Sequence, residues 1–289
     1  MNLEWLDRKA YPFHSNFIDL DMGRMHYVDE GHGETIVMCH GNPTWSFLYR
    51  HLIKGLSPAY RCVAMDYIGF GLSDKPPEWS YLPQMQAQNV ESLINRLGLK
   101  DITLVVQDWG GPIGLSYALR HPDNVKRLVI MNTWLWSVKG VREYEFFSGL
   151  LGGPLGRFLI KRFNFFAGPV MKYVSGDRSK LDRATQCHYL KPLATPAERK
   201  GSWVFPKRII DSSEWLASLW AQHEQIRHLP TLLLWGMSDP SFKARELQRF
   251  ESIFATYQTI RFEGVGHFVQ EEKKEALVPL IETFLVENF

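Results

Sequence analysis

The sequence predicts an α/β fold, in which a mostly parallel central sheet is flanked by helices on both faces. Short apolar runs alternate along the chain with segments of helical periodicity. Val, Ile and Leu crowd these runs without strict alternation, which is expected of strands that are buried on both faces. One long stretch, residues 134–229, breaks this rhythm.

The apolar runs are the expected strands, and the segments between and after them are expected to be helices. The strands are expected at Arg24–Val28, Thr35–Cys39, Arg61–Asp66, Ile102–Gln107, Arg127–Asn132, Thr231–Trp235 and Gln258–Phe262. The helices are expected at about Leu82–Leu97, Gly111–Arg120, Phe242–Phe254 and Lys273–Phe289.

Residues 134–229 contain helix-like segments, glycines and prolines, but no apolar run comparable to the others. A structureless loop of that length is uncommon in a compact domain. We therefore expect a helical cap at 134–229, inserted between two strands of a core formed by residues 1–133 and 230–289.

The composition argues against several classes of partner. Lys and Arg number 33 and Asp and Glu 31, and there is no basic run, so we expect neither nucleic acid nor a membrane as a partner. The first residues lack the layout of a signal peptide, and no apolar stretch approaches the length of a membrane span. Cys39 and Cys62 lie in strand-like runs and are expected to be buried thiols. A cytoplasmic location is expected, with no cofactor and no metal.

The sharpest chemical signal is the run VQDWGG (residues 106–111), where an expected strand meets an expected helix. In α/β-hydrolases this junction is the nucleophile elbow, usually G-x-S-x-G, and the small residues Gly110 and Gly111 suit its tight turn. Asp108 occupies the nucleophile position, and Val106 departs from the usual leading glycine. Taken alone, Asp108 is equally well explained as an N-cap of the helix.

Three further motifs follow expected strands. HGNP (40–43) has the form of an oxyanion-hole loop that brings Asn42 to the site, and it also reads as a simple turn. Asp239 comes just after a strand, and His267 lies in a glycine-containing loop after the last strand. The order Asp108, Asp239, His267 is the chain order of nucleophile, acid and histidine in α/β-hydrolase triads.

With these motifs the sequence resembles the haloalkane dehalogenases. The resemblance rests on HGNPTWSFLYR (40–50), DYIGFGLSDKP (66–76), VVQDWGGPIG (105–114), GMSDP (236–240) and GVGHF (264–268), and it covers nearly the whole expected core. It implies Asp108 as nucleophile, His267 as base, Asp239 as triad acid, and Asn42 with Trp109 as halide-binding donors. Some members carry the acid after the strand that ends here at Asn132, but no carboxylate follows before Glu143.

The residue types suit that chemistry. A carboxylate is ionised at neutral pH and attacks saturated carbon without a base, and a histidine can then activate water to hydrolyse the resulting alkyl ester. The implied substrates are small apolar halogenated molecules and water. The candidate pocket residues, each an equally good member of a cap core, are Trp134, Trp136, Phe146, Phe147, Phe165 and Phe166.

Two other enzyme classes stay open from the sequence. An epoxide hydrolase has the same triad logic and needs cap tyrosines, for which Tyr144, Tyr173 and Tyr189 are available. Cofactor-independent luciferases that oxidise coelenterazine are similar around Asp108 and Trp109. Asn42 beside the Asp108–Trp109 pair favours halide.

Overall fold

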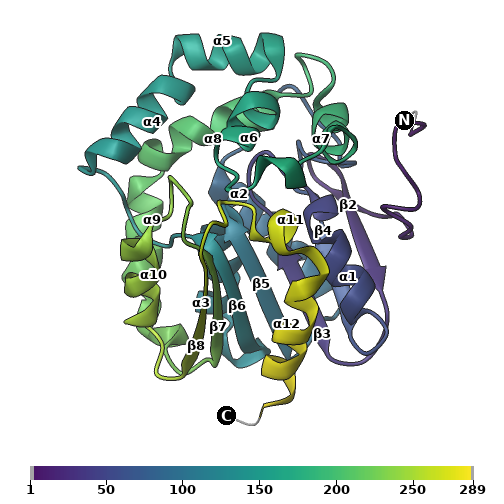
Figure 1. Cartoon of the computed structure of the whole chain (residues 1–289), viewed down its shortest axis with the longest axis vertical. Coiled ribbons are helices and arrows are strands. Elements are labelled where there is room, and N and C mark those ends of the chain that lie inside the picture. The colour runs from purple at the N-terminus through teal and green to yellow at the C-terminus, as the bar shows by residue number, and fades with distance from the viewer. Residues whose placement is uncertain (1–2, 288–289) are drawn as a thin grey trace.

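An eight-stranded sheet runs through the centre of the computed structural model, which describes residues 3–287 (Figure 1). The strands lie in the order β1-β2-β4-β3-β5-β6-β7-β8, antiparallel at the β1–β2 and β2–β4 pairs and parallel at the others. Their bounds are β1 (Asn16–Leu20), β2 (Gly23–Glu30), β3 (Thr35–Cys39), β4 (Arg61–Met65), β5 (Ile102–Asp108), β6 (Val125–Thr133), β7 (Thr231–Gly236) and β8 (Tyr257–Phe262). The predicted fold class is confirmed.

Helices cover both faces of this sheet. One face packs against α2, α3 and α10, and the other against α1 and α12. The bounds of these helices are α1 (Arg50–Leu56), α2 (Pro83–Arg96), α3 (Gly110–Arg120), α10 (Ala244–Glu251) and α12 (Leu277–Val286). A further core helix, α11 (Val269–Lys273), comes just before α12.

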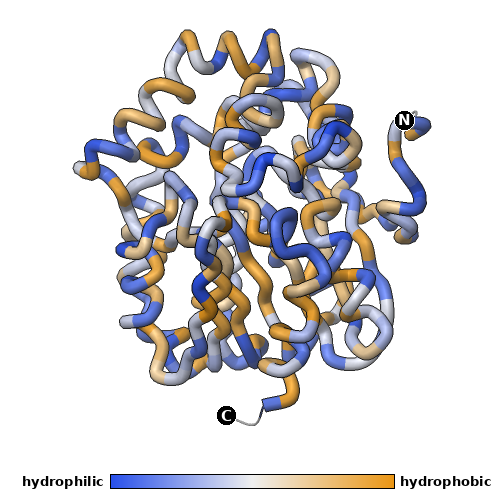
Figure 2. Tube along the Cα trace, in the orientation of Figure 1, coloured by the Kyte–Doolittle hydropathy of each residue, from blue (hydrophilic) through white to orange (hydrophobic). Residues whose placement is uncertain are grey.

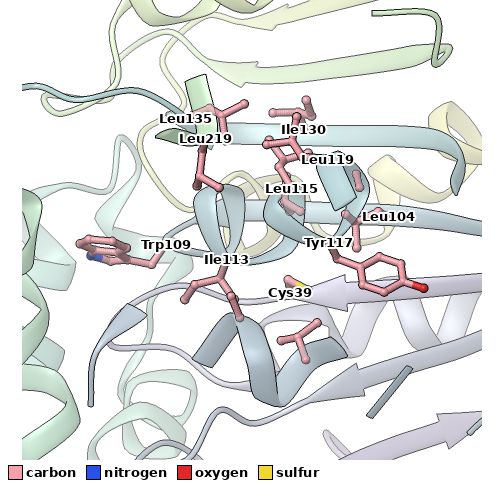
Figure 3. Packing of buried hydrophobic residues seen from close by; sticks show 14 of the residues in the cluster. Cys39, Leu104, Trp109, Ile113, Leu115, Tyr117, Leu119, Ile130, Leu135 and Leu219 are labelled. Atoms are coloured by element: carbon pink, nitrogen blue, oxygen red, sulfur yellow. The ribbon is translucent and has the colours of Figure 1, made fainter. Parts of the chain in front are cut away.

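The central strands are apolar throughout because both of their faces are buried. All of β3 and β7 is buried, and neighbouring residues of β3 enter different cores: Val37 packs with the α3 side and Ile36 with the α1 side. Figure 3 shows the α3 side, where Ile113 and Leu115 of the helix lie close to Cys39 of β3. Burying each such side chain contributes roughly 1.5–3 kcal/mol to the free energy of folding, before the cost in conformational entropy is subtracted.

The segment between β6 and β7, residues 134–229, contains helices and turns but no strand among the described residues. We call it the helical insertion. Its helices are α4 (Arg142–Gly152), α5 (Pro154–Phe163), α6 (Met171–Tyr173), α7 (Arg183–Leu190), α8 (Lys200–Asp211) and α9 (Ser213–Trp220). It lies above the end of the sheet at which the parallel strands finish (Figure 1). In residues 3–287 no helix is long and apolar enough to cross a bilayer.

The structure differs from the sequence-based expectations at the edges of the sheet. Strand β1 and helix α1 were not expected; β1 is a short, partly exposed edge strand paired in a hairpin. The expected helix Lys273–Phe289 is broken, because Lys274 has a positive φ of 50° that separates α11 from α12. Its last two residues lie outside the described range. The helix expected at Phe242–Phe254 is shorter, spanning Ala244–Glu251.

Candidate active site

Asp108 occupies a sharp turn between β5 and α3. Its φ is +51°, a backbone conformation that non-glycine residues adopt rarely and that stores strain. The hydroxyl of Thr133, at the end of β6, donates a 2.5 Å hydrogen bond to the Asp108 carbonyl and holds the turn. Val106 is tolerated in place of a glycine because a Cβ on Gly114 would lie only 2.9 Å from its Cγ1, so Gly114 provides the missing space.

The two oxygens of the Asp108 carboxylate have different surroundings. Oδ1 accepts a 2.8 Å hydrogen bond from the backbone N–H of Asn42, and the backbone N–H of Trp109 also donates to the carboxylate. The HGNP loop approaches this closely only because residue 41 is glycine: a Cβ there would lie 2.3 Å from Oδ1. Oδ2 instead faces His267. The Asn42 amide therefore holds Oδ1, while Oδ2 faces the histidine.

His267 connects the two carboxylates. Its Nδ1 lies 2.8 Å from Oδ2 of Asp239, while its Nε2 lies 3.6 Å from Oδ2 of Asp108. The first distance is a hydrogen bond that favours a proton on Nδ1, and the second is too long for one. The neutral imidazole then carries its lone pair on Nε2, the nitrogen nearer to Asp108. The three residues that chain order relates are thus brought together, although 131 positions separate Asp108 from Asp239.

Burial and charge shift the pKa values of this pair. Burial raises the pKa of Asp108, and the attraction of His267 and the two amide donors offsets only part of that rise. Burial lowers the pKa of His267, but the carboxylates of Asp239 and Asp108 outweigh it, so the His267 pKa lies above its ordinary value of 6.5. Perturbed groups of this kind in a cavity are typical of catalytic sites.

Two buried amides that the sequence did not single out support the site. Asn132, near the end of β6, donates a 3.0 Å hydrogen bond from Nδ2 to Oδ2 of Asp239. The strand after which some family members carry the acid thus provides an amide partner for Asp239 here. Gln107 lies beside the nucleophile in sequence, with its Nε2 2.9 Å from His267 Nε2 and 3.2 Å from the His267 carbonyl. Both amides orient groups of the triad without being part of it.

A third unforeseen residue, Glu272, ties the histidine loop to the helical insertion. Its carboxylate accepts backbone hydrogen bonds from Gly266 at 2.9 Å, Gly176 at 3.1 Å and Asp177 at 2.8 Å. The backbone N–H of His267 also donates to the carbonyl of Val174 at 2.9 Å. The insertion and the loop that carries His267 are therefore one hydrogen-bonded unit.

Asn42 and Trp109 line the same cavity as Asp108. Asn42 Nδ2 donates to the Ser202 carbonyl at 3.3 Å, which uses one of its two hydrogens. Among residues 3–287, the indole N–H of Trp109 has no hydrogen-bond acceptor. The ring itself is packed edge-on against Trp134 and Phe205, with centroids 4.7 and 5.1 Å away.

The cavity has a volume of about 500 Å³ and opens between the core and the insertion. Of the six aromatic residues considered from the sequence, Trp134, Phe146, Phe147 and Phe166 line it. The other two do not line it: Trp136 packs in the core against Phe250 and Trp220, and Phe165 packs with the small apolar cluster of the insertion, as the cap-core alternative expects. The remaining walls include Pro43, Tyr144, Val170, Met171, Tyr173, Val174, Pro206, Ile209, Phe242 and Phe268.

The tyrosines that an epoxide hydrolase would need are differently engaged. Tyr189 is fully buried and its hydroxyl donates to Glu271, away from the cavity. Tyr144 lines the cavity, but its hydroxyl donates to the Ser241 carbonyl at 2.8 Å. Tyr173 is 66% exposed. Tyr189 therefore does not line the cavity and the Tyr144 hydroxyl already has an acceptor, so these two tyrosines give the epoxide alternative no support.

Comparisons with known proteins agree with the fold. A family model described as the alpha/beta hydrolase fold matches residues 34–274. Haloalkane dehalogenase 2 of Mycobacterium tuberculosis is 36% identical over 96% of this chain and 97% of its own length. A cis-3-alkyl-4-alkyloxetan-2-one decarboxylase of Shewanella oneidensis is 33% identical over 96% of this chain and 90% of its own. A crystal structure of the haloalkane dehalogenase of Agrobacterium tumefaciens C58 superposes with a TM-score of 0.80 at 26% identity, covering 94% of this chain and 96% of that one.

The sheet, the aspartate at the elbow and the family match define an enzyme of the α/β-hydrolase class. The 36% identity to the mycobacterial relative, over nearly the whole of both chains, identifies the family within that class. The chain belongs to the haloalkane dehalogenase family.

Proposed function

We propose that the protein hydrolyses carbon–halogen bonds in halogenated alkanes, releasing an alcohol, a halide ion and a proton. One observation carries the proposal: the Asp108 carboxylate stands at a strained elbow beside the cavity, with Oδ1 held by the Asn42 backbone N–H and Oδ2 facing His267. An ionised carboxylate in that position is a ready nucleophile for saturated carbon.

In the first half-reaction, Oδ2 of Asp108 attacks the carbon that bears the halogen. A carbon–oxygen bond forms, the carbon–halogen bond breaks, and the halide leaves with the bonding pair. Two side-chain donors stabilise it: the Trp109 indole N–H and the Asn42 N–H that Ser202 does not occupy. No formal acid is required, because halide is a weak base.

In the second half-reaction, water hydrolyses the alkyl ester on Asp108. His267 Nε2 takes a proton from the water, the hydroxyl adds to the Asp108 carboxyl carbon, and Asp239 stabilises the imidazolium. The developing oxyanion is Oδ1, which already lies 2.8 Å from the Asn42 backbone nitrogen. Collapse expels the alkoxide, which takes the proton held by the His267 imidazolium. The carboxylic acid left on Asp108 then loses its proton to solvent, which regenerates the carboxylate and releases the net proton of the reaction.

The helical insertion acts in this scheme as a cap. Its side chains, among them Phe147, Phe166 and Met171, give the cavity an apolar wall that excludes water from the nucleophile. The substrates are accordingly small apolar halogenated molecules. The three cysteines are unpaired, which is compatible with the reducing environment of the cytoplasm.

The experiment that tests the proposal is a substrate panel. Brominated and iodinated alkanes should release halide faster than chlorinated ones, since weaker carbon–halogen bonds give better leaving groups. Released halide is measured alongside diol from a matched set of epoxides, with Asp108→Ala as the inactive control. Diol formation without halide release would overturn the assignment in favour of epoxide hydrolysis.

A second candidate function is decarboxylation of a β-lactone, and the 33% identity to the Shewanella decarboxylase favours it. Asp108 would attack the saturated ring carbon that is bonded to the ring oxygen. The bond between that carbon and the ring oxygen would break, which opens the ring to a free carboxylate. Loss of carbon dioxide would then form the carbon–carbon double bond as the Asp108 carboxylate departs. This sequence consumes no water, so it has no step that needs His267 as a base.

His267→Phe separates the two functions. With a 3,4-dialkyl β-lactone the variant should continue to release carbon dioxide over many turnovers, if decarboxylation is the reaction. With a bromoalkane it should stop after one. Wild-type protein that releases halide but no carbon dioxide excludes the second candidate, and the converse excludes the first.

A further inference from the structure

The outer side of the helical insertion carries an unusual number of exposed apolar side chains. Of the ten large hydrophobic residues exposed in the described chain, six lie between residues 146 and 173. They are Phe146 (73% exposed), Leu150 (49%), Leu155 (62%), Phe158 (57%), Phe163 (60%) and Tyr173 (66%), and we call them the outer apolar patch. Exposed apolar residues gathered in one region mark an interaction surface more often than scattered ones do.

Positive charge accompanies this patch without negative charge. Residues 146–176 contain Arg157, Lys161, Arg162 and Lys172, and no Asp or Glu. The helical insertion as a whole has 15 Lys and Arg against 8 Asp and Glu, whereas the rest of the chain has 18 against 23. The near-neutral total therefore conceals a basic insertion on an acidic core.

The patch lies on the outermost helices of the molecule. Helices α4 and α5 pack inward on α8, and α8 with α9 packs on the core through Phe205, Ile209 and Leu216. Figure 1 shows α5 as the element farthest from the sheet, and Figure 2 shows apolar and polar residues interleaved along it. On α5, Gly156 and Ile160 face inward, while Leu155 and Phe158 face outward beside the cations.

We propose that the outer apolar patch docks on the surface of an anionic lipid bilayer. Apolar side chains that enter the headgroup boundary, flanked by Lys and Arg that pair with lipid phosphates, are the combination that such a surface recognises. The position of Lys161 and Arg162 at the end of α5 is also favourable for the helix dipole. That effect does not explain why Phe158 and Phe163 stand exposed beside them.

The patch is continuous with the entrance of the cavity. Phe146 and Tyr173 belong to both: they line the cavity and are among the most exposed apolar side chains. A bilayer on this side would place the entrance at a reservoir in which apolar molecules concentrate. The docking itself needs no substrate, so it is tested independently of the proposed reaction.

The test is co-sedimentation of the full-length protein with phosphatidylcholine vesicles, with and without phosphatidylglycerol. The protein should bind the anionic vesicles, bind the neutral ones far less, and be released by salt. Lys161→Glu/Arg162→Glu and Leu155→Ser/Phe158→Ser should each weaken binding at least about tenfold. Thermal unfolding of the Leu155→Ser/Phe158→Ser variant should be unchanged, because these side chains are exposed. Thermal unfolding of Lys161→Glu/Arg162→Glu should shift slightly to lower temperature, because two favourable charges at the end of α5 are reversed.

Matched controls lie outside the insertion. Arg8→Glu/Lys100→Glu makes the same charge change, and Tyr257→Ser/Val286→Ser removes two comparably exposed apolar side chains. These variants should bind the vesicles like the wild type. Equal loss in controls and patch variants, or no binding to anionic vesicles, overturns the proposal. A dimer detected by light scattering that Leu155→Ser/Phe158→Ser dissociates would assign the patch to a second copy of the chain instead.

Discussion

The core and the helical insertion contribute different things to one site. Asp108 is the last residue of the core strand β5. Asp239, His267, Asn42 and Trp109 each follow a core strand. The insertion contributes walls and an entrance instead. Its own apolar cluster contains only three buried residues, Leu151, Ile160 and Phe166, so its order depends on packing against the core. Reaction type and substrate choice can therefore change separately.

The two regions meet at a few well-defined hydrogen bonds. The Ser202 carbonyl of the insertion accepts from Asn42, the Val174 carbonyl accepts from the His267 backbone, and Glu272 bridges both regions. The insertion thus helps to position Asn42 and His267, the proposed halide donor and the proposed base, although neither residue belongs to it. The following predictions test how far this division holds.

The largest effect is expected from His267→Phe. Alkylation needs only Asp108 and its two halide donors, whereas ester hydrolysis needs the imidazole. Mixed with excess bromoalkane, the variant should release about one bromide per active site and then nearly none, as a trapped covalent intermediate does. The intact mass should rise by the alkyl group, and digestion should locate the adduct on Asp108.

Two controls accompany that measurement. His223→Phe, a histidine of the insertion outside the cavity, should keep full turnover. Adding Asp108→Ala to His267→Phe should abolish the burst. If His267→Phe is folded and shows no burst, the histidine acts in the first step and the two-step scheme is wrong.

The next largest effect is expected from the halide donors. Trp109→Phe keeps an aromatic ring but removes the N–H, and Asn42→Ala removes the amide. By analogy with the loss of one oxyanion donor, each should slow the bromide burst by about 10²–10³-fold, or roughly 2.7–4 kcal/mol. Trp136→Phe is the control, since that indole packs in the core. Full burst rates in both site variants would contradict the halide assignment.

The core was well predicted from the sequence because its signals are local. The run Thr35–Cys39 is a strand with those bounds, and the strand expected at Thr231–Trp235 extends by one residue to Gly236. Continuous burial on both faces leaves a continuous apolar run, which one sequence is enough to reveal. The edge strand β1 and the short helix α1 have no such run, and both were missed.

The site was predicted only where a motif marks it. Asp108, Asp239 and His267 each follow a strand, and parallel strands bring such positions together. Glu272 could not be found this way, because its partner Gly176 is 96 positions distant and the bonds are to backbone. The positive charge of the helical insertion was missed for another reason: the chain-wide charge of +2 is the sum of a basic insertion and an acidic core.

A smaller effect is expected where the two regions are joined. Glu272→Gln leaves one acceptor oxygen for three backbone N–H groups, so hydrogen bonds worth about 1–3 kcal/mol are weakened. Turnover should fall several-fold, and amide exchange should increase around Gly176 and Gly266. Glu263→Gln removes the same charge from an exposed position in the loop and should change neither. If Glu263→Gln lowers turnover as much as Glu272→Gln does, the loss is due to the removed negative charge and not to the hydrogen bonds of Glu272.

The smallest effect concerns pH and follows from the charges around His267. In the resting enzyme its pKa is raised above 6.5, because the carboxylates of Asp239 and Asp108 outweigh the effect of burial. Hydrolysis requires the neutral ring, so turnover should be lost as the pH falls through the relevant pKa. Esterification removes the charge of Asp108 and with it one of the contributions that raise that pKa. The acid limb of single-turnover ester hydrolysis should therefore lie at lower pH than the titration of His267 that NMR detects in the resting enzyme.

On the acid side of that limb, wild-type protein should show a bromide burst followed by slow turnover, because a protonated imidazole leaves Asp108 ionised and able to attack. A hydrolysis limb at or above the resting titration would mean that Asp108 does not lose its charge in the intermediate, and the aspartyl ester would have to be abandoned.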